Sequence, residues 1–381
     1  MTPDEKAEIL IDLAHRLESH QEDILRENKK DLDRMDDGNP KKDRLKLTKE
    51  RISGLCQSLK DVAKLPDPTH QLLSEKTLDN GLQVQKISVP LGVVGIIYES
   101  RPNVTVDVAA LGIRSGNGVV LRGGSDAMYS NSILVKLIRE TLSNKGIDDR
   151  AIQLLPTDRE FVKEMLTADG LIDIIIPRGS QALIDFVRAN ATVPTIETGA
   201  GVCHTYVEAS ADQEKAAEIV VNAKTSRPSV CNALDTILVD ESIAAEFLPK
   251  LKTGFAVFDK INYPRLSAAT EESFGKEYLD FQCSVKVVQG PKEALQHIRT
   301  YSSKHSEANV SENDELCEQF LRQVDAAAVY ANASTRFTDG GVFGLGAEIG
   351  ISTQKLHARG PFALEKLVTE KWIIRGGGQI R

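Results

Sequence analysis

The sequence predicts an α/β protein in which a doubly wound, mostly parallel sheet is followed by a second α/β domain. Short runs of Val and Ile without alternation recur between helical segments of about ten residues or more, as expected for parallel strands covered on both faces. A second set of such runs follows further along the chain. The length of 381 residues and the hydrophobic content of 41% allow about two domains of ~100–200 residues each.

The chain opens with a helix whose start is marked by a capping box. Thr2 provides the N-cap, Pro3 the first helical position and Glu5 the reciprocal side chain. Apolar residues then recur at helical spacing, at Ile9, Leu10, Leu13 and Leu17. Similar periodicity predicts further helices through 24–32 and 48–59, so the N-terminal part forms a helical layer.

Residues 82–89 change to the alternating pattern of a strand. Leu82 and Val84 lie in one phase, whereas Ile87 and Val89 lie in the other, so we predict one strand with a phase slip or bulge.

From residue 93 onward, predicted strands alternate with helices, and ligands are expected at the carboxyl ends of the strands. The strands are expected at 93–98, 118–122, 151–155, 171–176, 195–196, 236–239 and 285–288. The helices are expected up to residue 114, from 127, from 159, over 180–189 and over 213–223.

Composition and charge exclude several classes of function. The chain carries 47 basic and 55 acidic residues, a net charge of −8, and has no basic face for nucleic acid. No run approaches the ~18 apolar residues of a membrane span, and the N-terminus lacks the apolar segment of a signal peptide, so a cytoplasmic protein is expected. Five widely spaced cysteines without a Cys-x-x-Cys pair predict neither a disulfide framework nor a metal site.

Two glycine-containing turns are candidates for binding a nucleotide, although no Gly-x-Gly-x-x-Gly follows a strand and no Walker loop is present. They occupy 121–125 and 176–180, each between a predicted strand and a helix. Glycine allows close backbone approach, and a helix N-terminus beside Arg or Ser favours phosphate. Ordinary strand–helix turn chemistry is the alternative, and the residues alone leave both interpretations open.

The polar segment 222–236 contains the strongest local signal for catalysis. It places Cys231 between an amphipathic helix and an apolar strand, in a loop with Lys224 and Arg227. Cations near a thiol favour the thiolate, which is the nucleophilic form. A lone cysteine is more often a small buried hydrophobe. The other cysteines fit that interpretation better: Cys56, Cys203, Cys283 and Cys317.

Several segments, among them Arg227-Pro-Ser-Val-Cys-Asn232, together resemble the γ-glutamyl phosphate reductases of the aldehyde dehydrogenase superfamily. The same segments resemble the reductase half of bifunctional pyrroline-5-carboxylate synthases. They span nearly the whole chain in the family's order, at 89–107, 176–180, 227–232, 332–341, 343–348 and 357–361. The resemblance implies an aldehyde dehydrogenase-like fold. Its parts are a doubly wound cofactor-binding domain over 1–227, a catalytic domain with Cys231 over 228–353, and a return segment with a β oligomerisation arm over 354–381, which 80–90 joins.

The resemblance also implies roles for individual residues. Cys231 matches the nucleophile, and Asn232 lies near the thioester oxygen. Asn103 is a candidate donor to the acyl oxygen, together with the Cys231 amide. The cofactor would contact Arg122, Gly123, Ser125, Pro177, Arg178, Gly179, Ser180 and Glu277. Asp280 is the alternative to Glu277 as the acid that holds the nicotinamide ribose. The carboxylate and phosphate of the substrate would meet Arg101, Lys224, Arg227, Ser334 and Arg336.

The implied activity is NADPH-dependent reduction of L-glutamyl 5-phosphate to L-glutamate 5-semialdehyde and phosphate through a Cys231 thioester. This is the second step of proline biosynthesis from glutamate. Arg122 is expected to read the 2′-phosphate of NADP, because no acidic residue lies in the turn 123–125 to prefer a free hydroxyl. The implied partners are γ-glutamyl phosphate as substrate, further copies of the chain in a homodimer or a multiple of one, and glutamate 5-kinase through functional coupling.

Two other functions stay open. An NAD-dependent semialdehyde dehydrogenase would form an acid, and Glu197 lies near the place of the water-activating base in acid-forming relatives. A structural role for Glu197 is the alternative. From another class, a non-catalytic paralogue would bind nucleotide only, and the presence of Cys231 argues against it.

Overall fold

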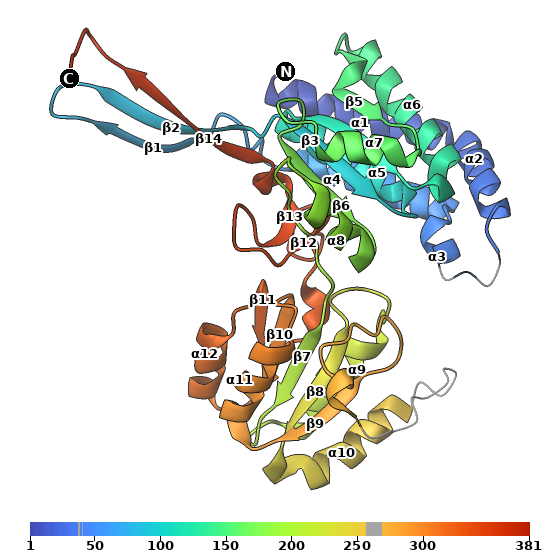
Figure 1. The fold of residues 1–381 in the computed structure, drawn as a ribbon, viewed down its shortest axis with the longest axis vertical. Helices are drawn as coiled ribbons and strands as arrows, with labels where there is room; N and C mark the ends of the chain where they lie inside the picture. Colours follow the sequence, from blue (N-terminus) through green and yellow to red (C-terminus); the bar gives the residue numbers. More distant parts are fainter. Residues whose placement is uncertain (37–38, 40, 257–268) are drawn as a thin grey trace. The chain divides into compact units, whose positions relative to one another are not determined.

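The computed structural model of the protein describes residues 1–36, 39, 41–256 and 269–381 (Figure 1). The chain divides into two compact units. Unit 1 comprises Met1–Thr198, Gly344–Gly350 and Phe362–Arg381, and unit 2 comprises Gly199–Phe343 and Ile351–Pro361. The division predicted after residue 227 differs from this one. The reason is that β7 (Cys203–Val207) pairs with β8 (Leu234–Asp240), so the chain enters the second sheet before residue 227.

A helical layer begins unit 1, as predicted. It consists of α1 (Pro3–Ser19), α2 (Gln21–Asp33), α3 (Lys41–Leu45) and α4 (Lys49–Lys64). The predicted capping box of α1 is confirmed: the Glu5 amide donates to Thr2 Oγ1 over 3.2 Å, and the Thr2 amide donates to Glu5 Oε2 over 2.7 Å. The apolar faces of α1 and α4 are buried against each other.

The sheet of unit 1 is parallel and doubly wound, with the strand order β5-β4-β3-β6. Its strands are β3 (Val93–Tyr98), β4 (Gly118–Gly123), β5 (Ile152–Leu154) and β6 (Ile174–Arg178). The helices that follow them are α5 (Pro102–Ser115), α6 (Met128–Asn144), α7 (Arg159–Leu166) and α8 (Gln181–Asn190), with the 3₁₀ turns η1 (Ser125–Ala127) and η2 (Asp149–Ala151). The winding reverses between β3 and β6, and the carboxyl ends at such a switch point are where these sheets bind ligands. The strand predicted at 195–196 is reduced to a single bridge between Ile175 and Thr195.

A three-stranded antiparallel sheet completes unit 1, in the order β1-β2-β14. Its strands are β1 (Leu72–Thr77), β2 (Gln83–Pro90) and β14 (Val368–Arg375). The predicted irregularity lies in the partner of the predicted strand: the register shifts between Leu72 and Ser74 of β1, whereas β2 pairs regularly with β14. β1 was not predicted, because all of its residues are exposed, which removes the alternating signal.

Unit 2 contains a second parallel sheet, in the order β11-β10-β7-β8-β9. Besides β7 and β8, its strands are β9 (Ser284–Val288), β10 (Ser306–Val310) and β11 (Ala328–Ala331). Its helices are α9 (Gln213–Thr225), α10 (Glu241–Ala256), α11 (Gly290–Tyr301) and α12 (Asp314–Gln323), with η3 (Glu271–Ser273) and η4 (Thr335–Phe337). A two-stranded ribbon of β12 (Glu348–Ser352) and β13 (Gly360–Ala363) and the turn η5 (Leu364–Lys366) precede β14.

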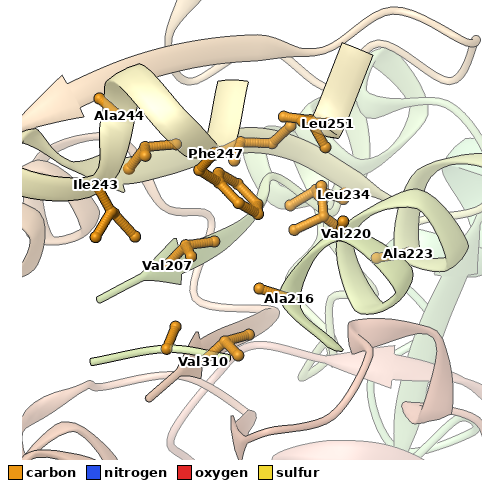
Figure 2. Packing of buried hydrophobic residues seen from close by; sticks show 14 residues of the cluster. Val207, Ala216, Val220, Ala223, Leu234, Ile243, Ala244, Phe247, Leu251 and Val310 are labelled. Carbon is orange, nitrogen blue, oxygen red and sulfur yellow. The ribbon is translucent and has the colours of Figure 1, made fainter. Parts of the chain in front are cut away.

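An apolar cluster packs α9 and α10 against the sheet of unit 2 (Figure 2). Phe247 of α10, Ala223 of α9 and Leu234 of β8 are fully buried in it. Burying one large apolar side chain contributes roughly 1.5–3 kcal/mol. Because Ala223 and Leu234 lie on either side of the loop that carries Cys231, the cluster fixes both ends of that loop.

Candidate functional site

Cys231 lies in the loop between α9 and β8 and is partly exposed. Three of the other cysteines are buried, namely Cys56, Cys203 and Cys317. Burial raises the pKa of Cys56 and places the pKa of Cys203 well above its usual range. Cys283 is partly exposed, like Cys231, but desolvation of its thiol raises its pKa to about 11. A thiol that stays protonated is a poor nucleophile. These surroundings leave Cys231 as the thiol best suited to nucleophilic chemistry.

The segment at the start of β7 holds the backbone of Cys231. Cys203 Sγ donates to the Cys231 carbonyl oxygen over 3.3 Å. Gly201 approaches so closely that a Cβ built on it would overlap the Cys231 carbonyl group and stand 2.8 Å from the Cys231 Cα. The Gly201 amide donates to Glu277 Oε1 over 2.9 Å, which brings this predicted cofactor residue to the cysteine loop. A role for Gly201 was not predicted, although the Gly-Ala-Gly segment at 199–201 signals a close backbone approach.

Arg227 and Arg336 contribute positive charge near Cys231. Arg336 donates from Nε to Ser226 Oγ over 3.1 Å. Burial lowers the pKa of Arg336, and the positive charge of Arg227 lowers it further, whereas Cys231 raises it. The two guanidiniums and the thiol are therefore electrostatic neighbours, and such cations favour the thiolate.

Asn232 is buried, and its side chain is engaged by the neighbouring loop. Nδ2 donates to the carbonyl oxygens of Arg336 over 3.3 Å and of Thr338 over 2.8 Å, and Oδ1 accepts from Arg336 Nη1. The Asn232 carbonyl accepts from Thr335 Oγ1 over 2.8 Å, and Ser334 Oγ accepts from the Arg336 amide over 3.3 Å. The geometry therefore makes the Asn232 side chain a positioning group for Arg336, which differs from the predicted contact with an acyl oxygen.

Lys224 also differs from its predicted role in substrate binding. Its side chain is 1% exposed, and its Nζ lies 3.5 Å from Oδ1 of Asp235, whose side chain is 2% exposed. The Tyr278 amide donates to the same oxygen over 3.0 Å. Desolvation raises the pKa of Asp235 to about 6, although the Lys224 charge opposes the shift. A buried ammonium with an internal partner does not offer its charge to a ligand in solvent.

The carboxyl ends of β3 and β6 meet at the switch point of unit 1. A cavity there is lined by Arg44, Glu99, Ser100, Arg101, Arg178 and Gly179. Glu99 Oε2 accepts from the Ser180 amide over 3.1 Å, and Glu99 Oε1 accepts from Ser180 Oγ over 3.3 Å. Ser180 also caps α8 by accepting from the Leu183 amide. The structure thus brings the predicted residues Arg101, Arg178, Gly179 and Ser180 together, and it adds Glu99, which was not predicted.

The second predicted turn follows β4. Arg122 Nη2 donates to the Thr157 carbonyl over 2.6 Å, and burial lowers the pKa of Arg122. Ser125 is exposed, and its carbonyl accepts from Arg34 Nη1 over 3.4 Å. A Cβ on Gly123 would overlap a neighbouring side chain, so close packing requires glycine there. Arg122 lies one strand away from the switch point, and Arg34 is a further cation at this turn that was not predicted.

Asn103, Pro177 and Glu197 also belong to unit 1. Asn103, in the first turn of α5, donates from Nδ2 to Asp107 Oδ2 over 3.2 Å, and desolvation raises the pKa of Asp107 to about 6. Pro177 is part of β6. Glu197 accepts from Arg188 Nε over 2.7 Å, and this contact raises the pKa of Arg188. An internal cation for Glu197 supports its structural role.

The residues of the switch point fit the pyrophosphate of a dinucleotide. Among the described residues, Arg178 Nε is buried without a hydrogen-bond partner. A Cβ on Gly179 would stand 2.9 Å from Glu99 Oε2, so glycine leaves room at the amino end of α8. Helix N-termini with adjacent arginines bind phosphates.

Over 1–36, 39, 41–256 and 269–381, no group of three or more His, Cys, Asp or Glu residues is placed to hold a metal ion. Within the same residues, no helix combines the length and the apolar character that crossing a bilayer needs.

Known proteins resemble this chain over most of its length. The model of the aldehyde dehydrogenase family matches residues 1–270. The γ-glutamyl phosphate reductase of Chlorobaculum parvum is 53% identical over 387 residues, which cover 98% of this chain and 92% of that protein. The chain belongs to the aldehyde dehydrogenase family. Its relatives within that family are γ-glutamyl phosphate reductases, as the sequence segments indicated, and it is therefore an oxidoreductase.

Solved structures of this family agree with the predicted fold class. The crystal structure of γ-glutamyl phosphate reductase from Thermotoga maritima superposes with a TM-score of 0.95 at 42% identity, covering 100% of this chain and 95% of that one. An acetylating aldehyde dehydrogenase from Geobacillus thermoglucosidasius, at 18% identity, has a TM-score of 0.72 over 100% of this chain and 93% of that one. The aldehyde dehydrogenase-like α/β fold is thus confirmed.

Proposed function

We propose that the protein reduces L-glutamyl 5-phosphate to L-glutamate 5-semialdehyde and phosphate with NADPH, through a thioester on Cys231. The observation that carries the proposal is the partly exposed Cys231 beside Arg227 and Arg336, in a chain 53% identical to a protein named γ-glutamyl phosphate reductase. The reaction is the second step of proline biosynthesis from glutamate, and we assign it to the cytoplasm, with functional coupling to glutamate 5-kinase.

In the proposed reaction, the Cys231 thiolate attacks the acyl carbon of the acyl phosphate. The sulfur–carbon bond forms, the bond from carbon to the phosphate oxygen breaks, and phosphate leaves. Arg227 and Arg336 stabilise the thiolate and the charge on the leaving phosphate. The Cys231 amide donates to the acyl oxygen, where negative charge develops.

When bound, NADPH supplies the hydride that reduces the thioester carbon. The carbon–sulfur bond then breaks, the thiolate of Cys231 is regenerated, and the semialdehyde is released and cyclises to pyrroline-5-carboxylate. We assign the pyrophosphate of the cofactor to Arg178, Gly179 and Ser180. We assign its adenosine ribose to the turn after β4, with Arg122 and Ser125, and keep Glu277 as the partner of the nicotinamide ribose.

Two observations argue against the alternative functions. An acid-forming dehydrogenase needs a free base for hydrolysis, whereas Glu197 is ion-paired with Arg188. A protein that only binds nucleotide has no need of a partly exposed thiol flanked by guanidiniums, as Cys231 is.

The antiparallel sheet of β1, β2 and β14 is the proposed oligomerisation arm. Its strands expose Leu72 at 55%, Trp372 at 57% and Ile374 at 55%, and strand edges of this kind pair with other chains. We therefore expect a homodimer or a multiple of one. Light scattering tests this: a monomer at micromolar concentration, unchanged when residues 368–381 are deleted, would contradict the assignment.

The activity is tested in the reverse direction, as reduction of NADP⁺ by pyrroline-5-carboxylate. The proposal requires that the rate depend on added phosphate, because the thioester returns to acyl phosphate only by phosphate attack. Cys231→Ser should lower the rate by several orders of magnitude, since a hydroxyl without an adjacent base is a weak nucleophile. Cys317→Ser is the matched control, with a change in stability at most. Phosphate-independent formation of an acid with NAD⁺ would overturn the proposal.

A further inference from the structure

Glu99 stands where the proposed function puts the pyrophosphate of the cofactor. It is the first residue after β3, at the switch point of unit 1. Its carboxylate accepts from both the amide and the Oγ of Ser180, at the amino end of α8. These donors and the helix dipole are what a bound phosphate would use. The Glu99 carboxylate thus occupies the place at the amino end of α8 where a bound phosphate would lie.

A second carboxylate in unit 1 makes the same kind of contact but is inaccessible. Asp31 accepts from the amides of Tyr129 over 3.1 Å and Ser130 over 2.8 Å, at the amino end of α6. Asp31 is 1% and Ser130 0% exposed, so this contact is a permanent cap. In contrast, Glu99 is partly exposed and Ser180 is exposed. A ligand from solvent can therefore take the place of Glu99 without opening the core.

The surroundings of Glu99 allow its side chain to move while its backbone stays in place. The next residue, Ser100, has a φ of +42°, which is uncommon outside glycine, and its Oγ donates to Asp126 Oδ2. The Glu99 amide donates to the Arg178 carbonyl over 3.2 Å. Arg101 and Arg178 line the same cavity, so a displaced carboxylate remains among cations.

We propose that the Glu99 carboxylate is a built-in substitute for the cofactor pyrophosphate, and that the dinucleotide binds only when Glu99 leaves the amino end of α8. This inference rests on the proposed function, which assigns the pyrophosphate to Ser180. Glu99 then stabilises the protein when no cofactor is bound. It also weakens the apparent affinity for the cofactor, because only those molecules in which Glu99 has left the amino end of α8 can bind it.

The test is calorimetric titration of Glu99→Gln and Glu99→Ala with NADPH, together with thermal melting of the empty proteins. Loss of an anion at a helix N-terminus corresponds to an affinity gain of roughly 3- to 30-fold. Both variants should bind NADPH more tightly by about this factor, and both should melt a few degrees lower than the wild type when empty. Adenosine 2′-monophosphate, which lacks the pyrophosphate, should bind the wild type and the variants equally.

Two control variants separate displacement from other effects. Asp31→Asn removes the charge of the buried cap, so it should lower the melting temperature without increasing the affinity for NADPH. Asp185→Asn removes an exposed carboxylate of α8 that pairs with Arg188, and it measures the effect of net charge alone. If NADPH binds the wild type but Glu99→Gln binds it equally or more weakly, the inference is overturned while the proposed function stands. If NADPH binds none of the proteins, both are overturned.

Discussion

Replacing Gly201 by alanine should disable the Cys231 loop while the rest of unit 2 stays folded. Real Cβ atoms essentially never come within 3.0 Å of another heavy atom, yet the new Cβ would overlap the Cys231 carbonyl and lie 2.8 Å from its Cα. These obstacles are backbone atoms, which cannot rotate away as a side chain can. We expect the loop to shift by about 1 Å, a displacement that can cost about 10²-fold in rate when it moves a reacting group. Overpacking of this kind costs roughly 1–3 kcal/mol of stability.

The assay compares Gly201→Ala with Gly199→Ala in the same loop. At Gly199, a Cβ would stand 3.4 Å from Thr353 Oγ1, so alanine fits there with little change. Turnover of pyrroline-5-carboxylate, alkylation of Cys231 by iodoacetamide and thermal melting are measured for both. Only Gly201→Ala should lose activity and alter the alkylation rate. Equal turnover and equal alkylation rates in the two variants would refute the argument that this close approach positions the thiol.

Three further predictions concern other parts of the protein. Arg122→Ala should weaken NADPH binding by roughly 10- to 100-fold and NADH binding much less, as measured by titration. An equal loss of affinity for both cofactors would show that Arg122 contacts a part of the dinucleotide that they share. Desolvation, with the nearby charges of His204 and Lys286, lowers the pKa of buried His297 to about 3. Because the unfolded chain binds this proton first, stability is lost as pH falls from about 6.5 to 3, and His297→Phe should recover up to about 5 kcal/mol at low pH in denaturant titrations. Asn232→Ala should destabilise the protein by about 1–3 kcal/mol and slow turnover, and an unchanged rate would remove its positioning role.

The sequence indicated the fold class well because its signals are local. Val and Ile runs identify buried parallel strands wherever helices cover them, and the capping box at Thr2 marks a helix start. β1 gave no such signal, because an exposed strand has no apolar period. For Lys224, in contrast to β1, the sequence does contain a signal, namely one for burial of its side chain. It lies seven residues after Ala217 and four after Val220, on the buried face of α9, so helical spacing already predicted its burial.

The functional pairs were hidden for a topological reason. Glu99 and Ser180 are 81 positions apart, and they meet because β3 and β6 are neighbours although β4 and β5 lie between them in the chain. A doubly wound sheet was predicted. Which two strands become neighbours where the winding reverses depends on tertiary packing, and no local sequence pattern records it.

The rule that such sheets bind ligands at their carboxyl ends applies to the two units differently. In unit 1 it leads directly to Glu99 and Ser180. In unit 2 the winding reverses between β7 and β10, where Ser311 Oγ donates to Glu208 Oε2 over 2.7 Å. Cys231 is at the opposite end, because it precedes Leu234, the first residue of β8. In unit 2, therefore, the thiol of Cys231 lies near the amino ends of β7 and β8. Its position is determined by the tight contact with Gly201 and not by a switch point.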